Sequence, residues 1–175
     1  MIKKLLYGWG RELILAVILA AIIMHFVKPI IICQTSMYPT LKDSDYVLIS
    51  RQAYEKLEKP RRGDIIVFRT DMTAEDGKDK NLVKRIIGLP GDIIEIEDGE
   101  VFLNGELLEE PYLNEQLMSG DMEEMIVPDG TFFCMGDNRG VSQDSRDSII
   151  GCIPKEDVLG RVIVRLYPFN TAGFL

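Results

Sequence analysis

Hydrophobic residues are distributed in two different ways along this chain. Residues 13–27 are almost continuously apolar, and Ile30–Ile32 extend the run beyond Lys28 and Pro29. Together they approach the ~20 residues that an α-helix needs to cross a hydrocarbon core of ~30 Å. The pattern predicts one N-terminal transmembrane helix, followed by a domain that is built in another way.

The residues before the apolar run indicate its orientation. Lys3, Lys4 and Arg11 precede it, and Tyr7 and Trp9 lie where an interfacial aromatic belt is expected. Positive charge is retained on the cytoplasmic side of a membrane. We therefore expect the N-terminus inside the cell and the rest of the chain outside it.

Three other interpretations of the run remain open. A cleaved signal peptide normally ends in a small-x-small site, whereas residues 25–29 read HFVKP. A lipoprotein signal has a small residue before its cysteine, and here Ile32 precedes Cys33. A buried core helix is the third possibility, since Lys28 and Pro29 shorten the uninterrupted apolar run. An uncleaved anchor is the interpretation that the sequence favours.

From residue 45 onward the pattern is typical of β structure. Short runs rich in β-branched and aromatic residues alternate with turn residues, and Asp98-Gly99 and Asn104-Gly105 are strong hairpin signals. Residues 109–124 are acidic and lack periodicity, so we interpret them as a solvated loop rather than a flap near a substrate. The predicted elements are strands at 45–50, 63–68, around Lys84, 92–97, 100–103 and 161–167, a hairpin joining 125–127 to 131–135, a loop at 70–80 and a short helix at 154–159.

Composition narrows the class of protein. At 175 residues the chain is long enough for one anchored domain of ordinary size. Its 28 acidic and 20 basic residues give a net charge of −8, and the basic N-terminal stretch leaves the remainder more acidic still. Proteins that bind nucleic acids neutralise phosphates with clustered Lys and Arg. We therefore expect no nucleic-acid partner.

The three cysteines are Cys33, Cys134 and Cys152. An odd number at irregular spacing is neither a disulfide framework nor a zinc-binding pattern. Cys134 and Cys152 can pair only if their Cα atoms approach within ~7 Å. We expect free, buried thiols instead.

Ser36 is the first residue that suggests chemistry. It opens the stretch SMYPTL at most ~25 Å of extended chain beyond Pro29, since each residue spans at most ~3.6 Å. A serine hydroxyl is a weak nucleophile at neutral pH and needs a base. The one histidine, His25, lies inside the apolar run, so a lysine is the alternative base. An ordinary turn serine is the competing interpretation.

Lys84 is the candidate base. It must be neutral to accept a proton, and burial in apolar surroundings lowers a lysine pKa from its usual ~10.4. Side chains alternate along a strand, so Lys84 shares one face with Leu82 and Ile86, while Arg85 lies on the other face. Periodicity does not decide which of the two basic residues points inward, and a solvated edge lysine is the alternative.

A third polar cluster occupies residues 136–146 (GDNRGVSQDSR) and follows an apolar strand. Alone it is typical of a solvated loop. In order along the chain, however, SMYPTL after a membrane span, GDIIVF, KRIIGLPGD and this cluster closely resemble the bacterial type I signal peptidases. The resemblance extends to the terminal Tyr167-Pro168-Phe169, and the single span and short intervening segments resemble the compact Gram-positive type.

The resemblance implies roles for individual residues. Ser36 is expected to be the nucleophile, with its own backbone N–H in the oxyanion hole, and Lys84 the general base. Some family members have a serine two residues before the nucleophile as a second oxyanion donor, whereas this chain has Gln34 there. The expected supporting residues are Ser142, which orients the lysine amine, the ion pair of Asp144 and Arg146, and Asp137 and Arg85.

The sequence thus predicts a mainly β fold: a β-rich Ser/Lys peptidase domain at residues 33–175, after a cytoplasmic tip and transmembrane anchor at residues 1–32. We expect it at the cytoplasmic membrane with its catalytic domain outside, cleaving signal peptides from secreted pre-proteins without a cofactor or metal. The expected partners are these pre-proteins, the lipid bilayer and, transiently, the export machinery. The alternatives are a self-cleaving Ser/Lys repressor-type peptidase and a non-catalytic assembly or chaperone factor.

Overall fold

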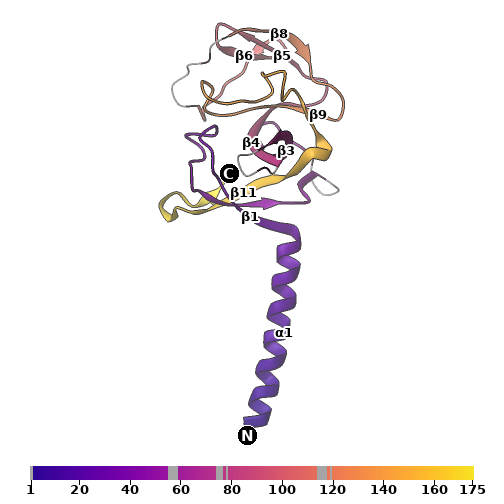
Figure 1. Cartoon of the computed structure of the whole chain (residues 1–175), viewed down its shortest axis with the longest axis vertical. Coiled ribbons are helices and arrows are strands. Elements are labelled where there is room, and N and C mark those ends of the chain that lie inside the picture. The colour runs from indigo at the N-terminus through magenta and orange to yellow at the C-terminus, as the bar shows by residue number, and fades with distance from the viewer. Residues whose placement is uncertain (1, 55–58, 74–76, 78, 114–117, 119) are drawn as a thin grey trace.

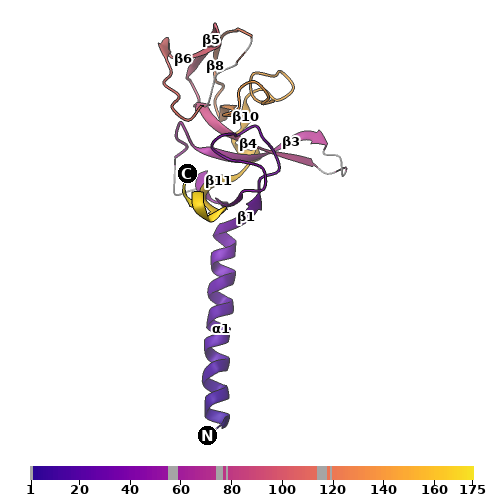
Figure 2. The same ribbon diagram turned by 90° about the vertical axis from the view of Figure 1, so that its left-hand side faces the viewer.

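A long helix and a β domain make up the molecule. The computed structural model describes residues 2–54, 59–73, 77, 79–113, 118 and 120–175. Helix α1 (Ile2–Phe26) projects from the β domain as a straight stalk (Figures 1 and 2). Its segment Trp9–Phe26 is long and apolar enough to cross a membrane, and none of it is buried inside the molecule. The side chains of residues 1–8 lie outside the described part, so the structure does not test the placement of Lys3, Lys4 and Tyr7.

Helix α1 ends earlier than the apolar run predicts. The chain turns directly into strand β1 (Val27–Ile31), which pairs antiparallel with β2 (Tyr46–Ser50) from Val27 opposite Ser50 to Ile31 opposite Tyr46. The prediction that residues 30–32 lengthen the membrane span is therefore wrong. Pro29 gives the physical reason, because a proline disfavours helical geometry at the residue before it and cannot continue a helix.

Two antiparallel sheets form the β domain. In the described residues the larger sheet has the order β1-β2-β11-β3-β4-β9-β10, with β12 paired to β11, and the smaller sheet has the order β7-β6-β5-β8. The smaller sheet lies at the end of the domain farthest from α1 (Figures 1 and 2). The strands of the larger sheet not yet given are β3 (Ile65–Thr73), β4 (Asp79–Gly88), β9 (Thr131–Met135), β10 (Ile153–Pro154), β11 (Val158–Tyr167) and β12 (Gly173–Phe174). Those of the smaller sheet are β5 (Ile93–Glu97), β6 (Glu100–Leu103), β7 (Glu106–Leu107) and β8 (Met122–Ile126).

The two predicted tight turns are confirmed. Asp98 and Gly99 have φ of 51° and 78°, and Asn104 and Gly105 have φ of 55° and 81°. Positive φ at both central residues is the geometry that Asp-Gly and Asn-Gly hairpin turns provide. These turns join β5 to β6 and β6 to β7.

Three predicted elements differ in the structure. The prediction that residues 125–127 and 131–135 form a hairpin is wrong, because β8 pairs with β5 while β9 pairs with β4 and β10. The predicted loop at 70–80 is shorter, since β3 continues to Thr73 and β4 begins at Asp79; residues 74–76 and 78 lie outside the described part. The short helix is a single 3-10 turn, Lys155–Asp157, and a second such turn, Phe169–Thr171, precedes β12.

Strand β4 runs through the centre of the apolar core. Val83 packs with the buried side chains of β2 and β3, whereas Leu82 and Ile86, on the other face, pack with Ile66 and Phe132. Because both faces of β4 are covered, its two consecutive basic residues are both buried: Lys84 is 1% exposed and Arg85 9%. The sequence could not decide between them, and the structure shows that neither faces solvent.

Candidate active site

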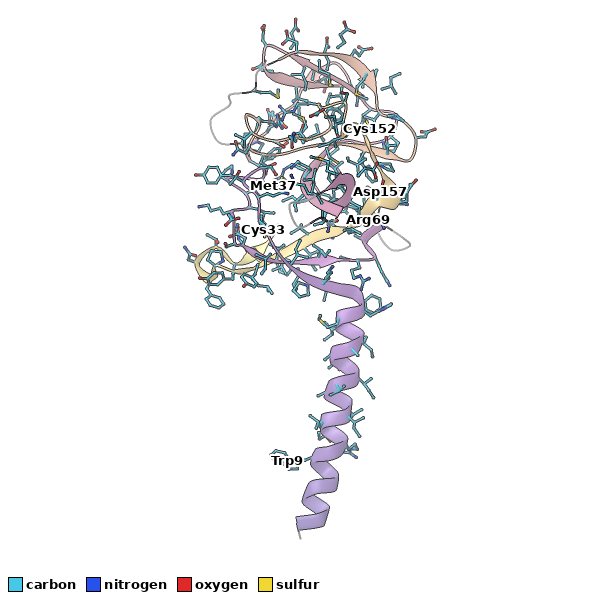
Figure 3. All side chains as sticks on the ribbon, viewed as in Figure 1. Trp9, Cys33, Met37, Arg69, Cys152 and Asp157 are labelled. Atoms are coloured by element: carbon cyan, nitrogen blue, oxygen red, sulfur yellow. The ribbon has the colours of Figure 1, made fainter. Side chains whose placement is uncertain are left out.

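Ser36 lies in a turn held firmly between core residues. The N–H of Tyr38 donates to the carbonyl oxygen of Thr35 (3.1 Å), and the N–H of Leu41 donates to that of Met37 (2.8 Å). Met37, labelled in Figure 3, is 1% exposed. Leu41 is fully buried, and both side chains pack in the core, which fixes the turn. Ser36 itself is 8% exposed. The predicted nucleophile is therefore positioned by its immediate neighbours.

Lys84 reaches Ser36 from the middle of β4. Its Nζ lies 2.6 Å from the Ser36 Oγ, within hydrogen-bonding distance. Burial lowers the pKa of Lys84 to about 8, while the negative charge of Asp144 acts in the opposite direction. A lysine with this pKa is partly neutral near pH 8, and its lone pair can then accept the serine proton. The structure brings together the two residues that the sequence predicts.

The loop after β9, residues 136–146, holds the Ser36 turn from the other side. The N–H of Asn138 donates to the Ser36 carbonyl oxygen (2.9 Å), and its side-chain amide donates to that of Thr35 (3.1 Å). Gly136 packs so closely that a Cβ there would lie 2.4 Å from the Ser36 carbonyl oxygen. In the described part of the chain no hydrogen bond occupies the Ser36 backbone N–H, so this donor is available to an oxyanion.

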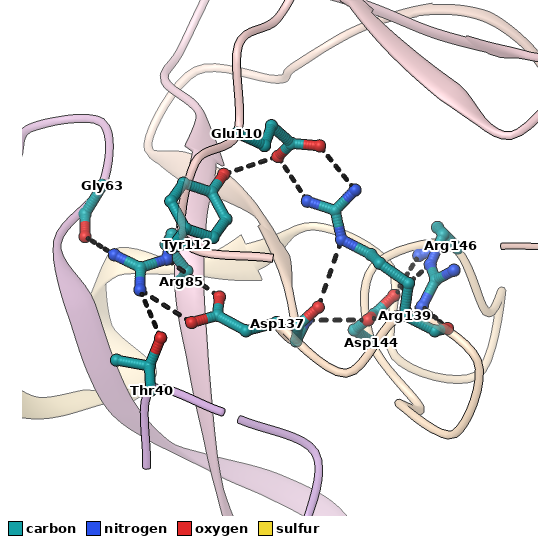
Figure 4. A network of polar contacts seen from close by, with 10 residues as sticks. Thr40, Gly63, Arg85, Glu110, Tyr112, Asp137, Arg139, Asp144 and Arg146 are labelled. Atoms are coloured by element: carbon teal, nitrogen blue, oxygen red, sulfur yellow. Dashed lines mark hydrogen bonds and ion pairs between the residues drawn. The ribbon is translucent and has the colours of Figure 1, made fainter. Parts of the chain in front are cut away.

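Two ion pairs brace this loop: the predicted pair of Asp144 and Arg146, and a pair formed by the predicted supporting residues Arg85 and Asp137. Arg85 binds Asp137 through two nitrogens, at 2.9 and 2.7 Å. Arg146 binds Asp144 in the same bidentate way, at 2.8 and 2.9 Å (Figure 4). Burial alone would raise the pKa of Asp144, but the hydrogen bonds and charge of Arg146 outweigh it, and the net pKa is lowered. The Asp144 carboxylate thus stays charged inside the domain.

Ser142 lies beside the dyad without a clear bond to it. Its Oγ is buried and makes no hydrogen bond of ordinary geometry with a described residue, although it is near enough to Asp144 to help lower the pKa of that carboxyl. A Cβ on Gly136 would lie 2.2 Å from this Oγ. Its predicted role in orienting the Lys84 amine stays a prediction.

The sequence analysis missed a second layer of contacts. Glu110, placed there in a solvated loop, has a side chain only 4% exposed and forms an ion pair with Arg139, which is 2% exposed. The ring of Tyr112 stacks on the Arg85 guanidinium, 4.0 Å from ring centroid to Cζ (Figure 4). The solvated-loop interpretation is therefore wrong for Glu110 and Tyr112, and for residues 122–124, which belong to β8; residues 114–117 and 119 lie outside the described part. No local pattern signals contacts between residues 29 positions apart.

A surface cavity of about 280 Å³ opens beside the dyad. Gln34 and Lys84 both line it, so Gln34 is placed near the site, and its use as a second oxyanion donor stays a prediction. The other residues that line it are Cys33, Thr35, Asp43, Lys80, Leu82, Val141 and Gln143. A larger cavity of about 720 Å³ lies between the end of β3 and residues 149–157, away from both dyad residues.

The remaining candidate ligands form no site of their own. The described residues contain no group of three His, Cys, Asp or Glu side chains placed to bind a metal. Cys33, Cys134 and Cys152 are all free thiols, as predicted, but only Cys134 is fully buried, while Cys33 is exposed and Cys152 half-buried. His25 contacts Gln52 at the end of α1, with the two side-chain nitrogens 3.4 Å apart.

Comparison with known proteins shows the family of the chain. The family described as "Signal peptidase, peptidase S26" matches residues 6–167. Signal peptidase I of Bacillus licheniformis is 37% identical, with 96% of this chain and 92% of the relative covered. Signal peptidase I S of Bacillus subtilis (strain 168) is 35% identical over the same shares. The crystal structure of a signal peptidase I from Enterococcus faecalis V583 is 32% identical, with a TM-score of 0.49 and coverage of 61% of this chain and 98% of that one.

The family match and these relatives place the chain in the class of peptidases. The chain belongs to the signal peptidase family, peptidase S26, and is an enzyme of the signal peptidase I type. The mainly β fold with one N-terminal apolar helix, predicted from the sequence, is confirmed.

Proposed function

We propose that the protein is a membrane-anchored serine endopeptidase that removes N-terminal signal peptides from secreted pre-proteins with a dyad of Ser36 and Lys84. One observation carries the proposal: the Lys84 Nζ lies 2.6 Å from the Ser36 Oγ and is buried deeply enough to lower its pKa to about 8. A nucleophile and a tuned base within hydrogen-bonding reach are the minimum for acyl transfer.

The reaction follows from this geometry. Neutral Lys84 accepts the hydroxyl proton while the Ser36 Oγ attacks the scissile carbonyl carbon. The Ser36 N–H, with Gln34 as a second candidate donor, stabilises the oxyanion. Lys84 then passes its proton to the leaving amine as the peptide bond breaks, which leaves an acyl-enzyme. A water molecule, deprotonated by Lys84, hydrolyses that ester and regenerates the serine.

The helix and its surroundings support attachment to a lipid bilayer. Trp9–Phe26 is apolar and unburied, and Lys3, Lys4 and Arg11 before or at its start favour a cytoplasmic N-terminus. In this arrangement the catalytic domain, which begins with β1 at Val27, lies outside the cell at the cytoplasmic membrane. It would meet pre-proteins there as they leave the export machinery, while their own apolar segments are still in the bilayer.

An exposed aromatic cluster on the β domain also favours the bilayer as a partner. Phe169 and Phe174 are 83% and 91% exposed, and Tyr167 packs edge-on against Tyr46 and Phe169. Tyr46 lies opposite Ile31 at the end of β1. The hairpin of β11 and β12 lies on the side of the domain from which α1 leaves (Figures 1 and 2). Aromatic side chains are enriched at the membrane–water interface.

Cleavage of a defined precursor tests the proposal. The purified full-length protein in detergent is expected to cut a precursor after an Ala-x-Ala sequence, as shown by the new N-terminus of the product. In a matched precursor with a bulky residue in place of the alanine before the cut, we expect cleavage to fall at least about tenfold. A folded protein that leaves the first precursor intact would instead be a non-catalytic homologue, and equal cleavage of both precursors would contradict the small-residue specificity.

The pH dependence of cleavage tests the base. Lys84 must be unprotonated to act, and its pKa is lowered to about 8. Below that pH the neutral fraction decreases, so kcat/KM is expected to fall about tenfold for each further pH unit. In the measurement, kcat/KM is determined from pH 6 to 10 with a peptide substrate whose own side chains do not titrate in this range. A flat profile down to pH 6 would rule out a lysine base.

A further inference from the structure

Residues 109–113, called here the clamp segment, follow β7 and precede β8, two strands of the smaller sheet. The side chain of Glu110 is only 4% exposed. Both of its carboxylate oxygens accept hydrogen bonds from Arg139; the Arg139 Nη1 donates to the Glu110 Oε2 at 2.7 Å. Two charges this far from water are costly unless they pair closely. The pairing therefore fixes the clamp segment to the loop of residues 136–146.

Arg139 distributes this contact through the loop. Its Nε donates to the carbonyl oxygen of Gly136 (3.2 Å), and its own carbonyl oxygen accepts a hydrogen bond from Arg146 (2.9 Å). Gly136 in turn donates its N–H to Asp144 (2.9 Å). Arg139, whose guanidinium Glu110 holds, thus contacts one end of the loop through its side chain and the other through its backbone carbonyl oxygen.

Tyr112 makes the second contact of the clamp segment. Its ring covers the guanidinium of Arg85, which also binds Asp137 and donates to the Gly63 carbonyl oxygen (2.8 Å). Its hydroxyl donates to Glu110 (Figure 4). The clamp segment therefore holds the loop at two points, Asp137 through Arg85 and Gly136 through Arg139.

The loop held in this way is in direct contact with the nucleophile. Asn138, which directly follows the two held points, donates its N–H to the Ser36 carbonyl oxygen (2.9 Å), and Gly136 packs against the same oxygen. Arg85 directly follows Lys84 on β4. A displacement of the clamp segment would therefore be transmitted to both members of the dyad through one or two intervening residues.

We propose that Glu110 and Tyr112 are positioning residues for peptide-bond cleavage, which keep the loop of residues 136–146, and through it the Ser36 hydroxyl, aligned with the Lys84 amine. The inference rests on the proposed dyad. It assigns to the clamp segment neither contact with the substrate nor a chemical step. Its effect on the rate comes from alignment, where an error of about 1 Å can cost about 100-fold.

The decisive variant is Glu110→Gln, with Glu109→Gln as its matched control. Glutamine keeps the shape of the side chain but leaves the buried Arg139 without a counter-charge. Glu109 is the exposed neighbour on the same segment. For Glu110→Gln we expect kcat to fall about 10- to 100-fold with KM changed less than about 3-fold, measured per folded molecule below the unfolding temperature. Glu109→Gln is expected to behave as wild type.

Two further variants test the positioning role even if Glu110→Gln folds poorly. Tyr112→Phe leaves the ring on Arg85 and removes only the hydroxyl donated to Glu110, so it should fold and lose a smaller part of kcat. In Glu110→Gln/Arg139→Gln no unpaired buried charge remains. Its loss of kcat is therefore expected to be clearly smaller than the product of the two single losses, which is the signature of residues that act as a pair.

The outcomes separate this inference from the proposed function. Unchanged kcat per folded molecule in Glu110→Gln, with only a lower unfolding temperature, would reduce the clamp segment to a structural role. A rise in KM alone would make it a substrate-binding element instead. Either result refutes the positioning role while Ser36→Ala remains inactive; if Ser36→Ala retains wild-type cleavage, it is the dyad itself that fails.

Discussion

Replacing Lys84 with methionine is expected to abolish cleavage and, at the same time, to stabilise the folded protein. Methionine fills a similar volume but cannot accept a proton, so kcat/KM should fall by about three orders of magnitude or more. The gain in stability has a separate cause. The pKa of Lys84 is lowered from 10.5 to about 8 in the folded protein, which means that the charged form is disfavoured there.

The sign of the effect follows from proton binding. Above pH 10.5 the amine is neutral in both states and has no effect on stability. Between pH 10.5 and about 8 the unfolded chain binds a proton that the folded protein does not, so stability falls as the pH falls. Below about pH 8 the full penalty is present, about 3 kcal/mol at 1.36 kcal/mol per pKa unit. Lys84→Met removes that penalty.

Thermal unfolding of the full-length protein in detergent measures this gain. At pH 7 we expect Lys84→Met to unfold roughly 6–12 °C above wild type, from about 2–4 °C per kcal/mol in a chain of this size. The difference should shrink at pH 10. Lys155→Met, at an exposed lysine in a 3-10 turn, is the control and should gain little. Ser36→Ala should lose cleavage without the gain, and a Lys84→Met protein no more stable than wild type at pH 7 would contradict the buried-base argument.

The same residue shows how far the sequence could predict the site. Ser36 and Lys84 were identified because their motifs are local and occur in order along the chain. Alternation along β4 placed Lys84 and Arg85 on opposite faces, but it carried no information about which face is covered. That depended on segments distant in the sequence: β2 and the Ser36 turn pack on the side of Val83, and Ala53 and Tyr54 pack on the side of Leu82.

Errors in the predicted fold come from the same limit. The Asp98-Gly99 and Asn104-Gly105 turns were predicted correctly, because two adjacent residues determine a tight hairpin. The pairing of β8 with β5, across more than twenty residues, was not predicted, since a three-residue apolar run fits either neighbour. Glu110 was interpreted as solvated because its partner Arg139 is distant in the sequence. Acidic composition alone does not reveal a buried ion pair.

Substituting alanine for Gly136 is the second change with a large expected effect. The glycine is required by space rather than by backbone geometry, since its φ is not among the positive values. A Cβ would lie 2.2 Å from the Ser142 Oγ and 2.4 Å from the Ser36 carbonyl oxygen. The serine hydroxyl can rotate away, but the carbonyl oxygen belongs to the backbone of the nucleophile and is held by the Asn138 N–H.

Relief of this overlap must therefore move the Ser36 turn or the loop of residues 136–146. We expect Gly136→Ala to lower kcat about 100-fold, since displacements of about 1 Å have effects of that size, and to destabilise the fold by about 1–3 kcal/mol through overpacking. Gly173→Ala is the matched control, because a Cβ there meets open space and its φ is not positive. Peptide cleavage and thermal unfolding are measured on both. Wild-type kcat in Gly136→Ala would show that Ser36 tolerates a shift of its backbone, and the dyad would then depend less on the loop of residues 136–146 than its contacts indicate.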